Sequence, residues 1–206
     1  LAEARTGGKT AIGLNFSEHA FRSFSDIHDS AHREKYVADV LATLCPMVQD
    51  PYFLLISSDT RCWENFPSDS YYQKIAYEWL KTNGRESSTS LLDPLITYPE
   101  VLNLLDGLDM VISGRMHLAL AAFRNHVIPI CLMGTGKNYT NIDKMRGMFD
   151  KFIGQTELVP SNTDELTLAV TFILNQKDGL KETLEKSLII IQKESYEKQH
   201  QLDRKS

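Results

Sequence analysis

Short apolar runs alternate with amphipathic stretches along most of the chain. Residues 10–16, 52–58, 109–113 and 127–133 each form a compact apolar segment that ends in polar or small residues. Runs of this length, without a polar face, are typical of strands buried on both sides of a parallel sheet. A weaker strand is expected around 88–95, and the tripeptide 157–159 is expected to add a last short strand.

The stretches between these runs carry helix-spaced apolar stripes and helix-capping residues. Asp29 and Ser30 offer N-caps to a helix that continues to Leu44, and Ser68 or Asp69 starts the next helix. Thr97 and Glu100 form a capping box for a short helix that ends at Leu105. Further helices are expected at 115–123, 139–150, 163–176 and 179–199.

Strands that alternate with helices predict βαβ units. The predicted fold is therefore an α/β domain, with a doubly wound, mainly parallel Rossmann-like sheet and helices on both faces. We expect one such domain over residues 1–206, with 193–206 as a charged helical tail. Ligands of this fold bind outside the carboxyl ends of the strands. The expected ligand-binding loops are therefore those at 15–18, 57–61, 113–117 and 134–138.

Composition narrows the classes of protein that fit. The chain has 206 residues, is 42% hydrophobic and carries a formal net charge of −5. This charge disfavours broad binding to nucleic acid or to anionic membranes. No uncharged apolar stretch reaches the ~18 residues of a transmembrane helix, and a signal peptide is not expected. The three cysteines, an odd number without close spacing, are expected to be reduced thiols of a cytoplasmic protein. No metal site is expected, because His28 and His32 lack a third ligand at a suitable spacing.

The segment 111–123 is the most informative part of the sequence. A strand leads into Ser113 and Gly114, and Arg115, Met116 and His117 then open a helix that is wholly apolar from 118 to 123. A helix N-terminus attracts anions, an arginine fork matches a carboxylate or a phosphate, and a histidine can exchange protons near neutral pH. The structural alternative is that Arg115 pairs with an aspartate such as Asp109 and that His117 is a satisfied core histidine.

The other three loops hold weaker candidates. Lys137, in the glycine loop after the strand at 127–133, is suited to neutralising a phosphate, or it is a solvated lysine of an ordinary turn. Asp59 and Arg61 follow the strand at 52–58, where a ribose contact, a phosphate contact and a structural ion pair are equally compatible with the sequence. Asn15, after the first strand, is placed either to bind a ligand or to cap the turn.

The run from Tyr98 to Gly136 resembles the signature of the polysaccharide pyruvyl transferase family. Two positions depart from that signature. Met116 replaces a leucine, and Asn125-His126 replaces a glycine before the next strand. The matching residues are Asp109, Val111, Ile112, Arg115, His117, Pro129, Ile130 and Lys137.

The resemblance implies a transferase with two Rossmann-like domains that face a cleft, the GT-B architecture. This chain would be the carboxy-terminal domain, with Leu1 near the junction to an amino-terminal domain that the chain lacks. Such enzymes transfer pyruvyl from phosphoenolpyruvate to two sugar hydroxyls, forming a ketal in exopolysaccharide or cell-surface glycan synthesis. The reaction needs no cofactor or metal.

On this interpretation, the strand-to-helix turn at 113–117 holds the donor. The expected donor contacts are Ser113, Gly114, Arg115, Met116 and Lys137, and His117 serves as the acid or the base. Asn15 and Asp59 are expected to contact substrate from neighbouring loops. Two alternatives stay open: a GT-B glycosyltransferase domain that binds a nucleotide sugar, with Asp59 on the ribose, and a non-catalytic Rossmann-like binding module.

Overall fold

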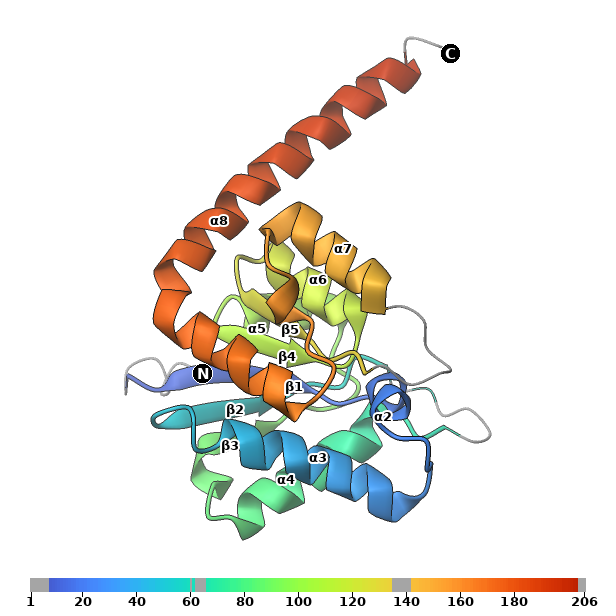
Figure 1. Ribbon diagram of the computed structural model, residues 1–206, viewed down its shortest axis with the longest axis vertical. Helices are drawn as coiled ribbons and strands as arrows, with labels where there is room; N and C mark the ends of the chain where they lie inside the picture. Colours follow the sequence, from blue (N-terminus) through green and yellow to red (C-terminus); the bar gives the residue numbers. More distant parts are fainter. Residues whose placement is uncertain (1–7, 60, 62–65, 135–141, 204–206) are drawn as a thin grey trace.

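Five parallel strands form the centre of the molecule (Figure 1). The computed structural model describes residues 8–59, 61, 66–134 and 142–203, with side chains up to residue 193. The order across the sheet is β3-β2-β1-β4-β5, which confirms the doubly wound, Rossmann-like fold. The strands are β1 (Thr10–Asn15), β2 (Pro51–Leu55), β3 (Thr89–Leu91), β4 (Met110–Ser113) and β5 (Ile128–Cys131).

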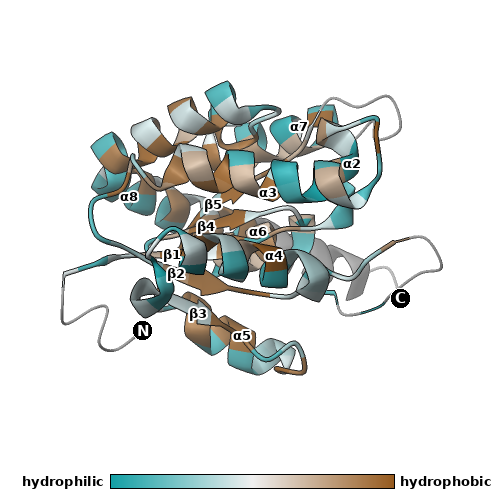
Figure 2. Ribbon diagram, turned by 90° about the horizontal axis from the view of Figure 1, so that it is seen from below, coloured by the Kyte–Doolittle hydropathy of each residue, from teal (hydrophilic) through white to brown (hydrophobic). Residues whose placement is uncertain are grey.

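Helices cover both faces of this sheet, and two hydrophobic clusters lie between the layers. The helices are α2 (Glu18–Phe24), α3 (Ser30–Leu44), α4 (Asp69–Thr82), α5 (Tyr98–Leu105), α6 (Met116–Arg124), α7 (Ile142–Ile153) and α8 (Thr163–Asp203). The larger cluster takes side chains from α2, α3, α4, α7 and α8, whereas α5 contributes only to the smaller one. Figure 2 shows the apolar strands between the helical layers.

The strands alternate between the two clusters, as the two-residue period of a strand requires. In β1, Ile12 and Leu14 belong to the larger cluster and Ala11 to the smaller one. In β4, Met110 belongs to the larger cluster and Val111 to the smaller one. Both faces of the sheet are therefore dry, which explains the apolar runs without a polar face.

Helix α6 is buried on two sides, as its sequence predicts. Ala119 and Phe123 pack in the larger cluster, and Leu118 and Ala122 pack in the smaller one. This burial fixes the helix firmly against β4 and β5. The first turn of α6, with Arg115 as its N-cap residue, is consequently held at the carboxyl edge of the sheet.

Three elements differ from the sequence-based expectation. The expected strand at 157–159 is wrong: Thr156–Leu158 is a 3-10 helix, and the segment meets the end of β5 through the Met133 amide, which donates to the Pro160 carbonyl. The two expected carboxy-terminal helices form one element, α8, with a non-helical residue at Gln176. Helix α2 was not expected, because seven residues are too few to show a clear period.

None of the helices in the described part of the chain has the length and apolarity needed to cross a membrane.

Gly134 and Gly147 provide a matched test of the packing. A Cβ on Gly134 would lie 2.1 Å from the Ser23 carbonyl oxygen, which is backbone and cannot turn aside, whereas a Cβ on Gly147 meets nothing within 4 Å. We expect Gly134→Ala to lower the free energy of unfolding by about 1–3 kcal/mol. Gly147→Ala lies inside α7 and should raise it by about 0.5–1 kcal/mol. Urea unfolding of both variants measures the difference, and equal effects would contradict the packing described.

Candidate active site

The candidate site lies where the connections of the sheet diverge. β1 and β4 are neighbours, but the chain leaves β1 toward β2 and leaves β4 toward β5. Their last residues, Asn15 and Ser113, face each other in the register. Ligands of doubly wound folds bind at such a switch point. Three of the four predicted loops meet here, at 15–18, 57–61 and 113–117.

A fully buried carboxylate, Asp69, organises this edge. Its Oδ2 accepts hydrogen bonds from the Asn15 side chain at 3.0 Å, from the Ser58 amide and hydroxyl at 3.3 and 3.1 Å, and from the Asp59 amide at 3.1 Å. Its Oδ1 accepts from Arg115 Nε at 3.1 Å and Nη2 at 2.8 Å. The charge is tolerated inside the protein because it has six donors. Asp69 thereby joins the loops that follow β1, β2 and β4.

Arg115 is held between two carboxylates. Besides its bonds to Asp69, its Nη1 lies 3.6 Å from Asp59 Oδ2, and the side chain is 17% exposed. The alternative that Arg115 pairs with an aspartate is confirmed. The suggested partner, Asp109, is wrong, because Asp109 accepts from the Ala11 amide and from Lys177 Nζ. The guanidinium is thus oriented from one side by buried contacts and reaches solvent on the other.

Asp59 and Arg61 form the ion pair that the sequence allowed. Arg61 Nε and Nη2 each lie 2.9 Å from a different oxygen of Asp59. The hydrogen bonds from the Arg61 side chain, opposed by partial burial and assisted by the Arg61 amide and the charge of Arg115, lower the pKa of Asp59 to about 2. Asp59 is therefore an anion at neutral pH and links the two arginines.

The turn from β4 into α6 is fixed by its small residues. The Ser113 hydroxyl donates to the Asn15 side-chain oxygen at 3.2 Å and to the Arg115 carbonyl at 2.9 Å. A Cβ on Gly114 would lie 2.7 Å from Ser17 Oγ, so only glycine lets this turn approach the start of α2. Asn15, Ser113 and Gly114 are buried and contact other groups of the protein. Direct contact of these three residues with substrate stays a prediction.

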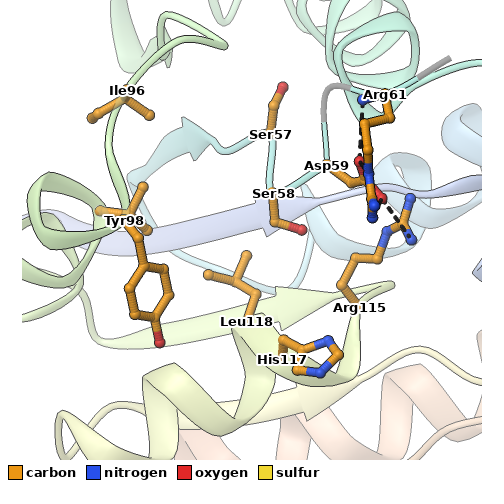
Figure 3. Close-up of a pocket in the computed structure, with 10 residues that line it drawn as sticks. Ser57, Ser58, Asp59, Arg61, Ile96, Tyr98, Arg115, His117 and Leu118 are labelled. Carbon is orange, nitrogen blue, oxygen red and sulfur yellow. Dashed lines mark hydrogen bonds and ion pairs between the residues drawn. The ribbon is translucent and has the colours of Figure 1, made fainter.

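A cavity of about 550 Å³ opens beside Arg115 (Figure 3). His117 is exposed and lines it, which contradicts the alternative of a satisfied core histidine. Met116, between the two, is half-buried and packs against the larger cluster. The polar side chains that line the cavity are Arg115, His117, Asp59, Arg61, Ser57 and Ser58, and its apolar wall is formed by Ile96, Tyr98, Val101 and Leu118.

A second cavity of about 280 Å³ shares Asp59, Arg61 and Arg115 with the first. Its other lining residues are Glu18, His19, Phe66 and Pro67. The two cavities therefore adjoin one another at these three residues.

Sequence reasoning missed Asp69, Glu18 and His19. The sequence indicates Asp69 only as a possible start of a helix, because an aspartate that caps a helix and a buried aspartate that accepts many hydrogen bonds cannot be told apart in sequence. A signal for His19 was present, because it lies directly after one of the predicted loops. Lys137 lies outside the described residues. Within the described ranges, no group of three histidines, cysteines or acidic residues is arranged to hold a metal ion.

Comparisons with known proteins support the fold. No protein-family model matches the chain, and no curated protein matches it. A solved structure of a mutant O-GlcNAc transferase from Thermobaculum terrenum, a GT-B glycosyltransferase, matches with a TM-score of 0.54 at 16% identity. The match covers 89% of this chain and 32% of that protein's chain. At this identity the likeness shows the fold alone: this chain has the Rossmann-like fold of one part of a GT-B transferase.

Asp69→Asn tests the buried hub. The substitution keeps the shape of the side chain but leaves the Arg115 guanidinium without its closest counter-charge. We expect a loss of about 3 kcal/mol in the free energy of unfolding, as for a broken buried ion pair. The control is Asp39→Asn, which removes an exposed partner of Lys35 and should cost less than about 1 kcal/mol. Equal losses in urea unfolding would refute the role of Asp69.

The lowered pKa of Asp59 predicts a pH dependence of stability. Its ordinary value is 3.8 and its folded value is about 2. The ionised group therefore stabilises the fold above pH 3.8, and this contribution is lost as the pH falls toward 2. We expect Asp59→Asn to flatten the pH dependence of the free energy of unfolding in this window. An unchanged slope would contradict the ion pairs described.

Proposed function

We propose that the chain is the donor-binding domain of a polysaccharide pyruvyl transferase-like enzyme. The observation that carries the proposal is that Arg115 and His117, the core of the family-like signature, line one open cavity at the switch point of the sheet. The likeness to about a third of a longer transferase chain supports the proposal that this chain is one domain, the carboxy-terminal one, of a larger enzyme whose amino-terminal domain completes the cleft. The product would be a pyruvyl ketal of an exopolysaccharide or cell-surface glycan.

The larger cavity contains donors suited to an anion. Arg61 and Arg115 line it together with one carboxylate, Asp59, and Asp69 pairs with Arg115 from the buried side. The N-terminus of α6 has no side-chain cap and carries roughly half a positive charge. Phosphoenolpyruvate offers a phosphate and a carboxylate to these groups. Arginine forks and helix N–H groups bind such oxygens well, and Lys137 is proposed as a further phosphate contact.

The reaction needs a proton donor at the methylene carbon of the donor. Protonation of C3 makes C2 electrophilic, and a sugar hydroxyl forms a bond to C2 while releasing its proton. The bond between C2 and the phosphate oxygen then breaks, phosphate leaves with the electron pair, and the second hydroxyl closes the ketal, its proton passing to phosphate. His117 faces the cavity and is assigned either to C3 protonation or to the release of the hydroxyl proton.

The second candidate is a GT-B domain that binds a nucleotide sugar. The apolar wall of Ile96, Tyr98, Val101 and Leu118 favours it, because a cavity of about 550 Å³ with such a wall can take a planar ring. Against it, Asp59 is bound to two arginines and is less suited to receiving ribose hydroxyls. A non-catalytic binding module would leave both ligands without effect.

Ligand-dependent stability separates these candidates. We expect phosphoenolpyruvate to raise the melting temperature, because a ligand at a hundredfold excess over its Kd stabilises the folded state by about 2.7 kcal/mol. Uridine diphosphate should leave it unchanged. The reverse pattern would favour the nucleotide-sugar domain, and no shift with either ligand would favour the binding module.

The role of His117 is tested in the same system. His117→Ala should unfold at the same urea concentration as the unchanged chain, because the side chain is exposed. In the intact enzyme with both domains, it should abolish phosphate release from phosphoenolpyruvate in the presence of glycan acceptor. His32→Ala, an exposed histidine paired with Asp29, is the control. Near-normal turnover in His117→Ala would overturn the assignment.

A further inference from the structure

The smaller cavity has a composition of its own. It adjoins the larger cavity and is lined by two arginines and two carboxylates, Arg61, Arg115, Glu18 and Asp59. Among the lining residues alone, carboxylates and arginines are equal in number here, whereas the larger cavity is lined by two arginines and one carboxylate. Phe66 adds a ring, and the guanidinium of Arg22 lies 4.0 Å from the centroid of that ring. A neutral ligand with many hydroxyls suits such a lining better than an anion does.

Glu18, the residue before His19, has a side chain that several hydrogen bonds hold in place. Glu18 is buried, accepts from Arg33 Nε and Nη2 at 3.0 Å and from Arg22 Nε at 2.9 Å, and also accepts from the Tyr72 hydroxyl. Burial alone would raise the pKa of Glu18, but the hydrogen bonds from Arg33, Tyr72 and Arg22 outweigh it and lower that pKa. The carboxylate stays charged and fixes the start of α2.

The start of α2 is also tied to the turn that carries Arg115. The Ser17 hydroxyl donates to the Gly114 carbonyl at 2.7 Å and accepts from the Ala20 amide at 3.2 Å. His19 is in the first turn of α2 and lines the smaller cavity. These contacts therefore fix the backbone of His19 relative to Arg115, and its exposed side chain reaches the smaller cavity from this fixed turn.

The surroundings of His19 lower its pKa and so favour its neutral form. Partial burial and the positive charge of Arg115 lower its pKa, and the carboxylates of Asp69, Asp59 and Glu18 oppose them only in part. The folded chain therefore holds a neutral imidazole at neutral pH, which can accept a proton.

We propose that the smaller cavity is the subsite for the sugar acceptor, and that His19 is the base that takes the proton of its attacking hydroxyl. The inference rests on the proposed function and deepens it. The hydroxyl oxygen bonds to C2 of the donor as its proton moves to the His19 imidazole, which becomes an imidazolium. His117, which lines the larger cavity, is left with the proton delivery to C3. On this assignment, His19 acts on the acceptor and His117 acts on the donor.

Binding followed at the histidine rings tests this assignment. The full chain is labelled with ¹⁵N in its imidazoles, and the ring signals of His19 and His117 are assigned with His19→Gln and His117→Gln. The probes are phosphoenolpyruvate and the methyl glycosides of glucose, galactose and mannose, each titrated to saturation or to its solubility limit. We expect at least one glycoside to move the His19 signals and phosphoenolpyruvate to move those of His117.

The variants provide the matched controls. His19→Gln should weaken glycoside binding about tenfold, the equivalent of one hydrogen bond of about 1.4 kcal/mol. It should leave phosphoenolpyruvate binding unchanged, while His117→Gln does not weaken glycoside binding. His32→Gln should affect neither probe. This double dissociation would not arise if His19 only stabilised the fold, since a structural defect would weaken both ligands.

The outcomes also separate the two proposals. If no glycoside moves the His19 signals, or if the glycosides move only those of His117, the acceptor subsite is refuted. If a glycoside moves His19 while phosphoenolpyruvate moves neither histidine, the subsite stands and the proposed donor fails. If His19→Gln binds every glycoside as tightly as the unchanged chain does, the role of His19 is refuted.

Discussion

One buried negative charge governs the architecture of the site. Asp69 has no exposed surface, and it joins Asn15, Ser58, Asp59 and Arg115, which arrive from three different strand ends. A carboxylate inside a protein is stable only when donors surround it. The need to satisfy Asp69 therefore brings the loops together, and their convergence places Arg115 at the sheet edge in a single orientation.

Outward from Asp69, charged side chains of alternating sign form a series of ion pairs. Arg115 is shared between Asp69 and Asp59, and Asp59 is shared between Arg115 and Arg61. Chains of this kind hold long side chains still at a solvent boundary, where a single surface pair would hold them weakly. Two cavities adjoin at these side chains, and the smaller of them has one more carboxylate, Glu18, in its lining than the larger one.

The sequence carried the fold more fully than the site. Strands that are buried on both faces have continuous apolar runs, so the sheet could be predicted from those runs. The burial of α6 on two sides could be predicted in the same way from the apolar residues 118–123. Arg115 and His117 could be found because they interrupt that pattern at a strand end. The partners of Arg115 could not, because Asp69 and Asp59 are far from it in sequence. Their contact with Arg115 depends on how three loops pack together, and this packing leaves no periodic pattern in the sequence.

The short strands at the two edges of the sheet limit pairing with other chains. The outer strands, β3 and β5, are only three and four residues long, and β5 is flanked by α8 and the 3-10 helix at 156–158. An unpaired edge is where a foreign strand adds and where fibrils begin to grow. Edges this short offer few free amides and carbonyls to such a strand, so the apolar centre of the sheet is shielded against self-assembly through its backbone.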